Sequence, residues 1–486
     1  MYLSEMFEGA PALEVTGLSV DSRSVRPGNI FFAIKGTALD GHKFIGSAVK
    51  NGAVAVVHSE PVDVSQYGGG VMPVFFQCDD VKGEQGRLSD LFYGSPSREM
   101  TVFGVTGTNG KTTVSSIIEW IYGGYAPCGY MGTNGVRFGD MDVLPSLTTP
   151  DVIEVHSDLA EMRKRGAEAV AMEVSSHGLA MRRVEKVDFD CAIFTNMTWD
   201  HLDYHKTMEN YMQAKSLLFR GIKPSGVAVL NADDAASIDL LKEVCACRYV
   251  TYGIDTPADY VARELEYGQR GTSFVLEHGG EHYPVKTNLL AKYNVSNLLS
   301  AMAAMHEMGM PLADIIARAD SIPQVEGRME IIDEGQDFMA IVDYAHTPDG
   351  YEKIFQFARE IAGKDGHIYA GFGCPGKRDI EKRPVMGEIA GRYCDGIVLT
   401  LEDPRDADPA EVARELAVGV ERAGCPYQVI LDREEAIGAL LDMANTGDVV
   451  LILGKGDEPY MYMEEGRAPW DGDHIVMRRQ LKKRLG

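Results

Sequence analysis

Residues 104–113 read Gly-Val-Thr-Gly-Thr-Asn-Gly-Lys-Thr-Thr, between a strand-like run at 100–103 and helical apolar spacing at 114–122. A glycine-rich loop between a strand and a helix that opens with Lys-Thr predicts a phosphate cradle. Its N–H groups and the helix N-terminus face the anion, Lys111 supplies positive charge, and Thr112 can ligate Mg²⁺. Val105 stands where the usual G-x-x-x-x-G-K-[ST] spacing has its first glycine. The remaining T-G-T-N-G-K-T favours nucleotide binding over the alternative, a glycine-rich turn with an exposed lysine.

Length and charge limit the classes of protein that this chain can belong to. A chain of 486 residues exceeds a single hydrophobic core, so about two to four domains are expected. The net charge of −25 argues against non-specific binding to nucleic acid or to anionic membranes. The eight cysteines are scattered without a C-x-x-C pair, and neither a signal peptide nor a membrane-length apolar run is recognisable. We therefore expect a cytoplasmic protein with reduced thiols and with no nucleic-acid or membrane partner.

The chain divides into three predicted domains, residues 1–96, 97–326 and 327–486. The first mixes short β-like runs with turns, whereas the second and third alternate strands and helices, which predicts parallel sheets covered by helices. The expected strands are 30–34, 53–57, 72–77, 100–103, 168–173, 192–195, 226–230, 340–343, 367–372, 396–401 and 449–453, with helices at 151–165 and 294–308. The strands of the third domain end in polar loops, so a second ligand-binding α/β domain is implied.

Polar residues of the middle domain could complete the phosphate site. Glu173 ends a strand and can reach a metal held by Thr112. His201 lies in residues 196–205, where two histidines and two aspartates indicate a metal or phosphate loop. Lys215 lies on a predicted helix, and Asn231 follows a strand and can bond a base or ribose. Taken singly, these residues also fit a structural carboxylate, a solvated turn and an exposed lysine.

The order of the motifs is more specific than any one of them. T-G-T-N-G-K-T, M-E-V-S-S-H-G-L, N-x-x-x-D-H-L-D-Y-H, A-K, N-A-D-D, N-V-S-N, G-R-M-E and D-Y-A-H-T-P-D follow one another. Over essentially its whole length the chain resembles the Mur ligases, the ATP-dependent amino-acid ligases of peptidoglycan precursor synthesis. Within them it is similar to the members that add the third residue of the stem peptide. The resemblance implies an α/β fold of three domains: a UDP-sugar-binding domain, a central P-loop parallel-sheet domain for ATP, and a C-terminal Rossmann-like α/β domain for the amino acid.

The resemblance also implies the residues of the ATP and metal sites. The implied ATP-binding residues are Gly107, Thr108, Asn109, Gly110, Lys111, Thr112, Thr113, Asn231, Asn294, Arg328 and Asp343. Mg²⁺ is the implied metal at two sites: Thr112 and Glu173 would ligate one ion, and His201 and a carbamylated Lys215 would ligate the second. A lysine carbamate offers the hard oxygen ligands that Mg²⁺ prefers, whereas an ammonium repels the ion. The implied catalytic residues are Lys111, Glu173, His201, Lys215 and His346.

The first implied substrate is UDP-N-acetylmuramoyl-L-alanyl-D-glutamate. The residues that match its binding positions are Val20, Ser22, Thr37, Ala38, Leu39, Thr148, Thr149, Ser175 and Arg183. Two positions depart from the family pattern, because Leu147 stands where an asparagine is usual and Met181 where a glutamine is usual. Each departure removes a polar contact with the muramoyl peptide.

The second implied substrate is a diamino acid. Its matching residues are Arg378, Glu402, Asp403, Pro404, Arg405, Gly454 and Glu458. The family signature for diaminopimelate is Asp-Asn-Pro-Arg, and residues 402–405 read Glu-Asp-Pro-Arg. Arg405 suits the distal carboxylate through a bidentate pair, whereas Asp403 cannot donate as asparagine does and adds a negative charge. We therefore favour meso-diaminopimelate, with L-lysine or another diamine as the alternative.

The implied reaction joins a carboxylate to an amine through an acyl phosphate that ATP supplies. The enzyme is expected to be a monomer. A folylpolyglutamate synthetase-like ligase is an alternative, but it leaves the Asp-Ser-Arg segment at 21–23 and the loop at 343–349 unexplained. A P-loop motor or switch and a non-catalytic nucleotide-binding module are further alternatives, and the polar loops at the strand ends argue against both.

Overall fold

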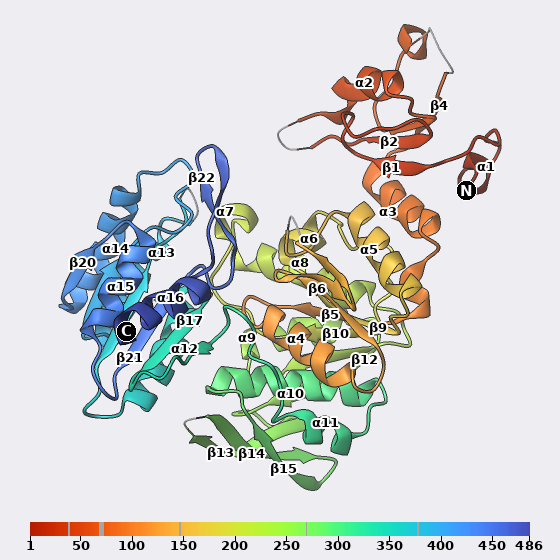
Figure 1. Ribbon diagram of the computed structural model, residues 1–486. Coiled ribbons are helices and arrows are strands. Elements are labelled where there is room, and N and C mark those ends of the chain that lie inside the picture. Colours follow the sequence, from red (N-terminus) through yellow and green to blue (C-terminus); the bar gives the residue numbers. More distant parts are fainter. Residues whose placement is uncertain (37–38, 68–71, 145–146, 269, 377–378) are drawn as a thin grey trace.

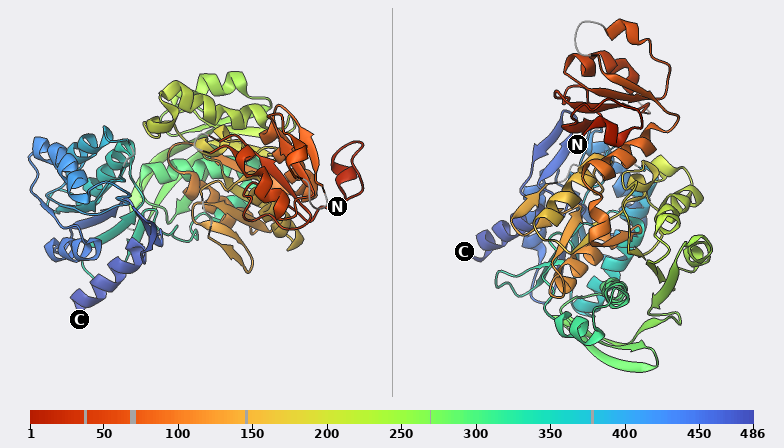
Figure 2. Two further views of the ribbon diagram at one scale, coloured as in Figure 1. Left: turned by 90° about the horizontal axis from the view of Figure 1, so that it is seen from above. Right: turned by 90° about the vertical axis from the view of Figure 1, so that its right-hand side faces the viewer.

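The computed structural model describes residues 1–36, 39–67, 72–144, 147–268, 270–376 and 379–486. Three of the residues named above, Thr37, Ala38 and Arg378, lie outside this range. One large sheet falls in each of the three predicted segments, and the middle segment lies between the other two in space (Figures 1 and 2). The domain boundaries themselves stay a prediction. Within the described residues, no helix combines the length and the apolar character that crossing a bilayer requires.

The first sheet is parallel throughout, in the order β1-β2-β3-β4. Its two central strands, β2 and β3, are buried. Short helices flank the sheet together with α3, which runs toward the middle domain and packs beside α5 (Val152–Lys164). The Gln85 side-chain amide donates to Asp151 Oδ1 over 3.0 Å across this junction. The elements are α1 (Leu3–Met6), β1 (Gly17–Ser19), β2 (Asn29–Ala33), η1 (Gly41–Phe44), α2 (Ile45–Lys50), β3 (Ala55–His58), η2 (Val64–Tyr67), β4 (Val74–Gln77), α3 (Val81–Phe92) and η3 (Pro96–Glu99).

The middle sheet has eleven strands in the order β15-β14-β13-β12-β11-β10-β5-β9-β6-β7-β8. The pairs from β13 to β6 are parallel, and antiparallel strands extend the sheet at both ends. The strands are β5 (Thr101–Thr106), β6 (Cys128–Gly132), β7 (Gly135–Phe138), β8 (Met141–Val143), β9 (Ala169–Glu173), β10 (Cys191–Phe194), β11 (Val227–Asn231), β12 (Arg248–Gly253), β13 (Tyr260–Gly268), β14 (Gly271–His278) and β15 (Glu281–Thr287).

Helices bury both faces of the parallel part of this sheet. One face packs on α4, α10 and α11, and the other on α5, α8 and α9. Burial on both faces explains why these strands read as continuous apolar runs rather than as alternating ones. The helices are α4 (Lys111–Tyr122), α5 (Val152–Lys164), α6 (Ser176–Ala180), α7 (Leu202–His205), α8 (Met208–Gly221), α9 (Ala235–Val244), α10 (Lys292–Glu307) and α11 (Leu312–Arg318).

The third sheet has the order β16-β17-β21-β18-β19-β20, with only β16 antiparallel. Helices α12, α13 and α14 cover one face, α15 and α16 cover the other, and a hairpin of β22 and β23 projects beside it (Figure 1). The elements are β16 (Glu330–Ile332), β17 (Met339–Asp343), α12 (Pro348–Ala362), β18 (Ile368–Phe372), α13 (Lys382–Tyr393), β19 (Gly396–Leu399), α14 (Pro409–Ala423), β20 (Tyr427–Val429), α15 (Arg433–Met443), β21 (Val449–Leu453), β22 (Tyr460–Met463), β23 (Gly466–Pro469) and α16 (Asp473–Leu485).

The α/β fold class is confirmed, as are the expected strands and helices to within a few residues. The run expected at 396–401 ends as a strand at Leu399. Sequence reasoning did not anticipate the antiparallel strands β7, β8, β13–β15 and β16, nor the hairpin of β22 and β23. In β14 only every second residue is fully buried, so no continuous apolar run marks it.

Candidate functional site

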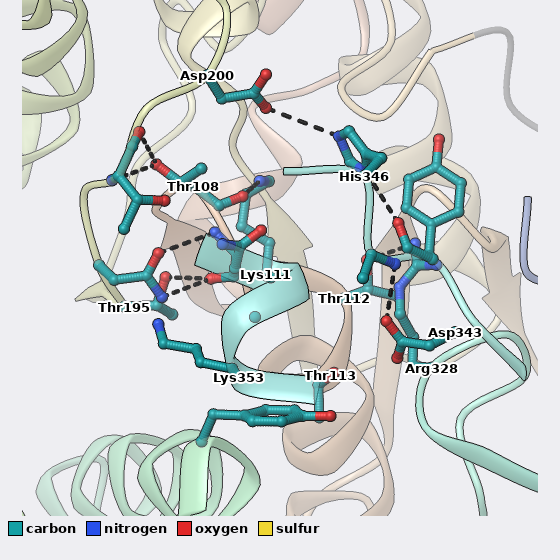
Figure 3. A pocket seen from close by; sticks show the side chains of 18 of the residues that line it. Thr108, Lys111, Thr112, Thr113, Thr195, Asp200, Arg328, Asp343, His346 and Lys353 are labelled. Atoms are coloured by element: carbon teal, nitrogen blue, oxygen red, sulfur yellow. Dashed lines mark hydrogen bonds and ion pairs between the residues drawn. The ribbon is translucent and has the colours of Figure 1, made fainter. Parts of the chain in front are cut away.

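A cavity of about 980 Å³ lies between the middle and third domains. It is lined by the glycine-rich loop after β5 and by the loops that follow strands of both sheets, as expected for open α/β sheets (Figure 3). It gathers many of the residues singled out in the sequence: Thr108, Asn109, Gly110, Lys111, Thr112, Thr113, Thr148, Glu173, Ser175, His201, Asn231, Asn294, Arg328, Asp343, His346, Glu402, Asp403, Arg405, Gly454 and Glu458.

The glycine-rich loop has the backbone of a phosphate cradle. Val105 is still a buried residue of β5, which explains why no glycine is needed there: the loop starts only at Gly107. Gly110 precedes α4 with φ +88°, and a Cβ there would meet Asn297 Oδ1 at 2.4 Å. The Lys111 ammonium lies over the loop and donates to the carbonyls of Gly107 and Thr108 over 3.0 and 2.9 Å. Burial lowers the pKa of Lys111.

Residues 195–198 brace this loop. The Thr195 hydroxyl donates to the Asn109 carbonyl over 2.6 Å. The Asn196 side chain accepts from the Asn109 N–H over 3.0 Å and donates to its carbonyl over 3.1 Å. The Thr198 N–H donates to Thr108 Oγ1 over 3.0 Å. The start of the 196–205 motif therefore fixes the phosphate loop, a role that its residue types alone did not indicate.

Glu173 and Thr112 form an oxygen-rich pair beside the loop. Glu173 is 1% exposed, and its Oε2 accepts from the Thr112 hydroxyl over 3.1 Å. Its Oε1 accepts from the Tyr130 hydroxyl over 2.6 Å and from the Thr133 N–H over 2.8 Å. Among the described residues no group of three or more His, Cys, Asp or Glu side chains is arranged to hold a metal ion. A hydroxyl and one carboxylate nevertheless fit Mg²⁺, which takes few protein ligands and completes its shell with phosphates and water.

Asp200 is a buried carboxylate that sequence reasoning quoted within a motif but did not choose as a site residue. Its Oδ2 lies 3.3 Å from His201 Nε2 and 3.7 Å from His346 Nε2, and its Oδ1 lies 3.9 Å from Lys382 Nζ. Burial alone would raise the pKa of Asp200, but these three neighbours hold it well below its usual value. His346 and Lys382 belong to the third domain, so Asp200 joins the two domains across the cavity (Figure 3). Burial lowers the pKa of His201 to about 3.

Lys215 lies behind the loop rather than on the cavity wall. It is 1% exposed on α8, and its ammonium lies 4.3 Å from the centroid of the Tyr211 ring. The Tyr211 hydroxyl is in turn 3.2 Å from Thr108 Oγ1. Burial lowers the pKa of Lys215 well below its usual value, which favours the neutral amine.

The remaining implied ATP residues are held by protein hydrogen bonds. Asn231 Nδ2 donates to the Thr195 carbonyl over 2.6 Å, and Asn294 Oδ1 accepts from Asn297 Nδ2 over 3.1 Å. The Arg328 guanidinium lies 4.0 Å from the Tyr344 ring centroid and 3.5 Å from Thr112 Oγ1. Asp343, at the end of β17, accepts from the N–H groups of Met329 and Ala345 over 2.6 and 2.7 Å, and burial raises its pKa.

The third-domain end of the cavity combines carboxylates with the guanidinium of Arg405. Glu402 Oε2 is buried without a hydrogen-bond partner among the described residues, and burial raises the pKa of Glu402 to about 7. A Cβ at Gly454, which has φ +108°, would meet this oxygen at 2.2 Å. Arg405 lies over the Tyr462 ring, with Cζ 4.9 Å from its centroid. Pro404 does not line the cavity, but its carbonyl accepts from the Ala407 N–H over 2.9 Å and so shapes the loop.

The residues implied for the UDP-linked substrate are only partly gathered. Thr148 and Ser175 line the cavity, and Thr149 and Arg183 lie behind them. The Thr149 hydroxyl donates to Ser175 Oγ over 3.1 Å, and the Arg183 guanidinium donates to the Thr149 carbonyl over 3.2 Å. In the first domain Val20 and Leu39 are exposed and Ser22 is buried. These three residues are not on the cavity wall.

A phosphate cradle that faces a second α/β domain across one cavity is typical of enzymes that use a nucleoside triphosphate to act on a further substrate. Comparison with known proteins gives the family. Residues 105–305 match the Mur ligase middle domain, residues 327–456 the Mur ligase glutamate ligase domain, and residues 14–82 the Mur ligase family catalytic domain. The chain belongs to the Mur ligase family, and it is an ATP-dependent ligase that forms an amide bond.

Two relatives are called UDP-N-acetylmuramoyl-L-alanyl-D-glutamate--2,6-diaminopimelate ligase. The one from Geobacillus thermodenitrificans is 40% identical, over 97% of this chain and 96% of its own. The one from Listeria monocytogenes is 37% identical over 100% of both chains. A solved structure of a ligase with this name matches with a TM-score of 0.69 and 31% identity, over 100% of this chain and 99% of its own.

More distant structures share the fold. MurF ligase from Thermotoga maritima in complex with ADP has a TM-score of 0.66 at 20% identity, over 98% of this chain and 100% of its own. Folylpolyglutamate synthase from Mycobacterium tuberculosis has a TM-score of 0.63 at 16% identity, over 83% of this chain and 95% of its own. At these identities the likeness extends to the fold alone.

Proposed function

We propose that this enzyme joins 2,6-diaminopimelate to UDP-N-acetylmuramoyl-L-alanyl-D-glutamate, with ATP as the energy source. The observation that supports it most is the cavity of about 980 Å³, which the phosphate loop lines together with Glu402, Asp403 and Arg405. The names of relatives 37–40% identical over nearly the full chain support the same substrates. The first domain would take the UDP-sugar, and the enzyme is expected to act as a cytoplasmic monomer.

The first chemical step transfers the γ-phosphoryl group of ATP to the D-glutamate side-chain carboxylate. The O–P bond to ADP breaks as a new O–P bond forms, which gives an acyl phosphate and ADP. Lys111 and the N–H groups of residues 107–113 would spread the charge that develops on the phosphoryl oxygens. Thr112 and Glu173 would hold Mg²⁺, which supplies charge neutralisation at the β- and γ-phosphates when it is bound.

The second step forms the amide bond. The amine nitrogen attacks the acyl carbon, the tetrahedral intermediate loses phosphate, and the amine loses a proton. Water must be excluded because acyl phosphates hydrolyse. The contacts of Asp200 with His346 and Lys382 support such closure, since they join the two domains around the reacting groups.

Lys215 is proposed to act as its carbamate. A neutral amine can attack CO₂, forming an N–C bond and releasing a proton, and the environment of Lys215 favours the neutral form. The product would bear oxygen atoms that suit Mg²⁺ better than an ammonium does. His201 would share the second metal site.

Selection of the amino acid is proposed to depend on two features of the 402–405 loop. Arg405 Nε is buried without a hydrogen-bond partner among the described residues, so the guanidinium retains capacity for a carboxylate. Glu402 Oε2 is similarly unpartnered and suits an ammonium of the substrate. L-Lysine lacks the distal carboxylate that Arg405 would bind, so diaminopimelate fits this loop better.

The experiment that tests the proposal is a phosphate-release assay on the purified protein. Release should require ATP, Mg²⁺, the UDP-dipeptide and 2,6-diaminopimelate together, and mass spectrometry should find the UDP-tripeptide. L-Lysine in place of diaminopimelate should give a much lower kcat/KM. Phosphate release that is independent of both the acceptor and the amine would contradict the proposal.

A further inference from the structure

Asp403 lies where the family resemblance implies a contact with the amino acid, yet protein groups already engage its carboxylate. The residue is 7% exposed. Its Oδ1 accepts from the Lys455 ammonium over 2.8 Å and from the Tyr462 N–H over 3.0 Å. Both donors belong to segments that follow β21, so this carboxylate links the loop after β19 to the part of the chain that forms the hairpin.

Lys455 is shared between two carboxylates. It is 1% exposed and contacts Glu458 as well as Asp403. The other oxygen of Glu458, Oε1, accepts from the Tyr344 hydroxyl over 3.0 Å. Burial alone would lower the pKa of Lys455, but Glu458 and Asp403 raise it above its usual value. The ammonium therefore stays charged, and each carboxylate contributes to keeping it so.

The backbone around Asp403 depends on the same hairpin. Asp403 and Arg405 have φ of +38° and +56°, in the left-handed region that non-glycine residues rarely adopt. The Arg405 N–H donates to the Tyr462 carbonyl over 2.8 Å. Tyr462 thus makes one backbone hydrogen bond to the Asp403 side chain and one to Arg405, while its ring lies beneath the Arg405 guanidinium.

We infer that Asp403 is a positioning residue for amino-acid selection. Its carboxylate, held by Lys455, fastens the β22–β23 hairpin at Tyr462 to the 402–405 loop and so sets the place of the Arg405 guanidinium. An asparagine could still accept a hydrogen bond here, but it would remove the charge that strengthens both bonds. The inference rests on the proposed function for its substrate and extends it by assigning Asp403 to the protein framework rather than to the ligand.

Limited proteolysis without any substrate tests the link to the hairpin. Residues 464–467 at its tip are exposed, and Glu464 and Glu465 are sites for a glutamate-specific protease. Asp403→Asn should speed cleavage at these two sites about tenfold, the factor expected when a charge-assisted hydrogen bond becomes a neutral one. Asp442→Asn, which removes the same charge from the exposed side of α15, is the control and should leave the cleavage rate unchanged. Unchanged cleavage in Asp403→Asn would overturn the inference.

Kinetics test the consequence for selection. Asp403→Asn should raise KM for 2,6-diaminopimelate about tenfold while kcat and the KM for ATP change less than about twofold. In a Lys455→Met background the same substitution should add less than about twofold, because the charged partner of the carboxylate is gone and only the Tyr462 N–H remains. A lower KM in Asp403→Asn, or an equal effect in both backgrounds, would contradict the inference. Failure of the parent enzyme to ligate would instead refute the proposed function. The proteolysis result would still show whether Asp403 fastens the hairpin to the 402–405 loop.

Discussion

At the scale of single residues, the charged groups of this site are buried or half-buried and depend on specific partners. Lys111 rests on loop carbonyls, Lys215 on an aromatic ring, and Arg405 on Tyr462. A buried ionisable group without a partner changes its protonation or its position. Substitution of Lys215 should therefore lower the ligase activity, whereas substitution of Arg405 should change the preference between amino acids.

For Lys215, replacement by alanine should remove most ligase activity, because no carbamate can form. Short carboxylates or bicarbonate should restore part of it by supplying the missing oxygen ligand, and the Mg²⁺ concentration that gives half-maximal rate should rise. The measurement is a Mg²⁺ titration of the initial rate, with and without added acetate. Lys242→Ala, in α9, is the control. Full activity of Lys215→Ala without any rescue agent would contradict the carbamate assignment.

For Arg405, replacement by alanine should weaken use of diaminopimelate by about 2–5 kcal/mol, the range for truncating one member of a buried charge pair. L-Lysine has no distal carboxylate, so its kcat/KM should change much less. The measurement is kcat/KM for both amino acids in the parent and in Arg405→Ala. An equal fall in kcat/KM for both amino acids, or a parent enzyme that prefers L-lysine, would show that Arg405 does not bind the distal carboxylate of the substrate.

At the scale of elements, the loops at the strand ends form the wall of the cavity, and the helices beneath them fix their position. Arg433 begins α15 and donates to the carbonyls of Leu401 and Leu453 over 2.9 and 2.8 Å. The same guanidinium forms a bidentate pair with Asp473, the first residue of α16, with both bonds 2.7 Å long. The loops after β19 and β21, at the third-domain end of the cavity, therefore share one buried support beneath them.

Removal of Asp473 should test this support. Asp473→Ala would leave the Arg433 guanidinium, 1% exposed, without its counter-ion, so the free energy of unfolding should fall by about 3–5 kcal/mol. Urea unfolding followed by circular dichroism measures the change. Asp471→Ala, which breaks the exposed ion pair with Arg479, is the matched control and should have little effect. A similar fall in the free energy of unfolding in both variants would contradict a larger contribution of the buried pair to stability.

The elements that could be predicted from the sequence are those with a local sequence pattern. Buried parallel strands such as β9 and β21 are continuous apolar runs, and the loop ahead of α4 has a motif of its own. Contacts between distant segments were out of reach: nothing near Asp200 in the sequence indicates that Lys382 lies beside it. The same holds for Lys455 and Tyr462, whose roles arise only when two loops and a hairpin meet. Local spacing identifies the phosphate loop, whereas tertiary packing decides what surrounds it.

At the scale of the whole molecule, direct contacts hold the third domain against the phosphate loop. The side-chain amide of Asn109, in that loop, donates to Asp349 Oδ2 over 3.1 Å, and the Lys353 ammonium donates to the same oxygen over 2.7 Å. Leu290 and Ala291 also pack into the core of the third domain. These contacts join two domains whose sheets are otherwise separate.

Loss of the Asp349 contact should uncouple the two chemical steps. Asp349→Ala should slow amide formation about tenfold while phosphate release continues, because water reaches the acyl phosphate more easily when the domains separate. The measurement is the ratio of phosphate to UDP-tripeptide formed. Asp365→Ala, at an exposed position just beyond α12, should keep the parent ratio. A parent-like ratio in Asp349→Ala would show that this contact does not seal the site.

The antiparallel extension of the middle sheet has a practical consequence. Gly279 and Gly280 join β14 to β15 with φ of +61° and +83°, and a Cβ at either would meet nothing within 4 Å. No described residue of β14 or β15 lines the cavity. A surface turn of this kind accepts added residues at an entropic cost that grows only slowly with length. A short peptide tag inserted there would let the enzyme be fixed to a sensor surface or given a fluorescent label while its chemistry remains untouched.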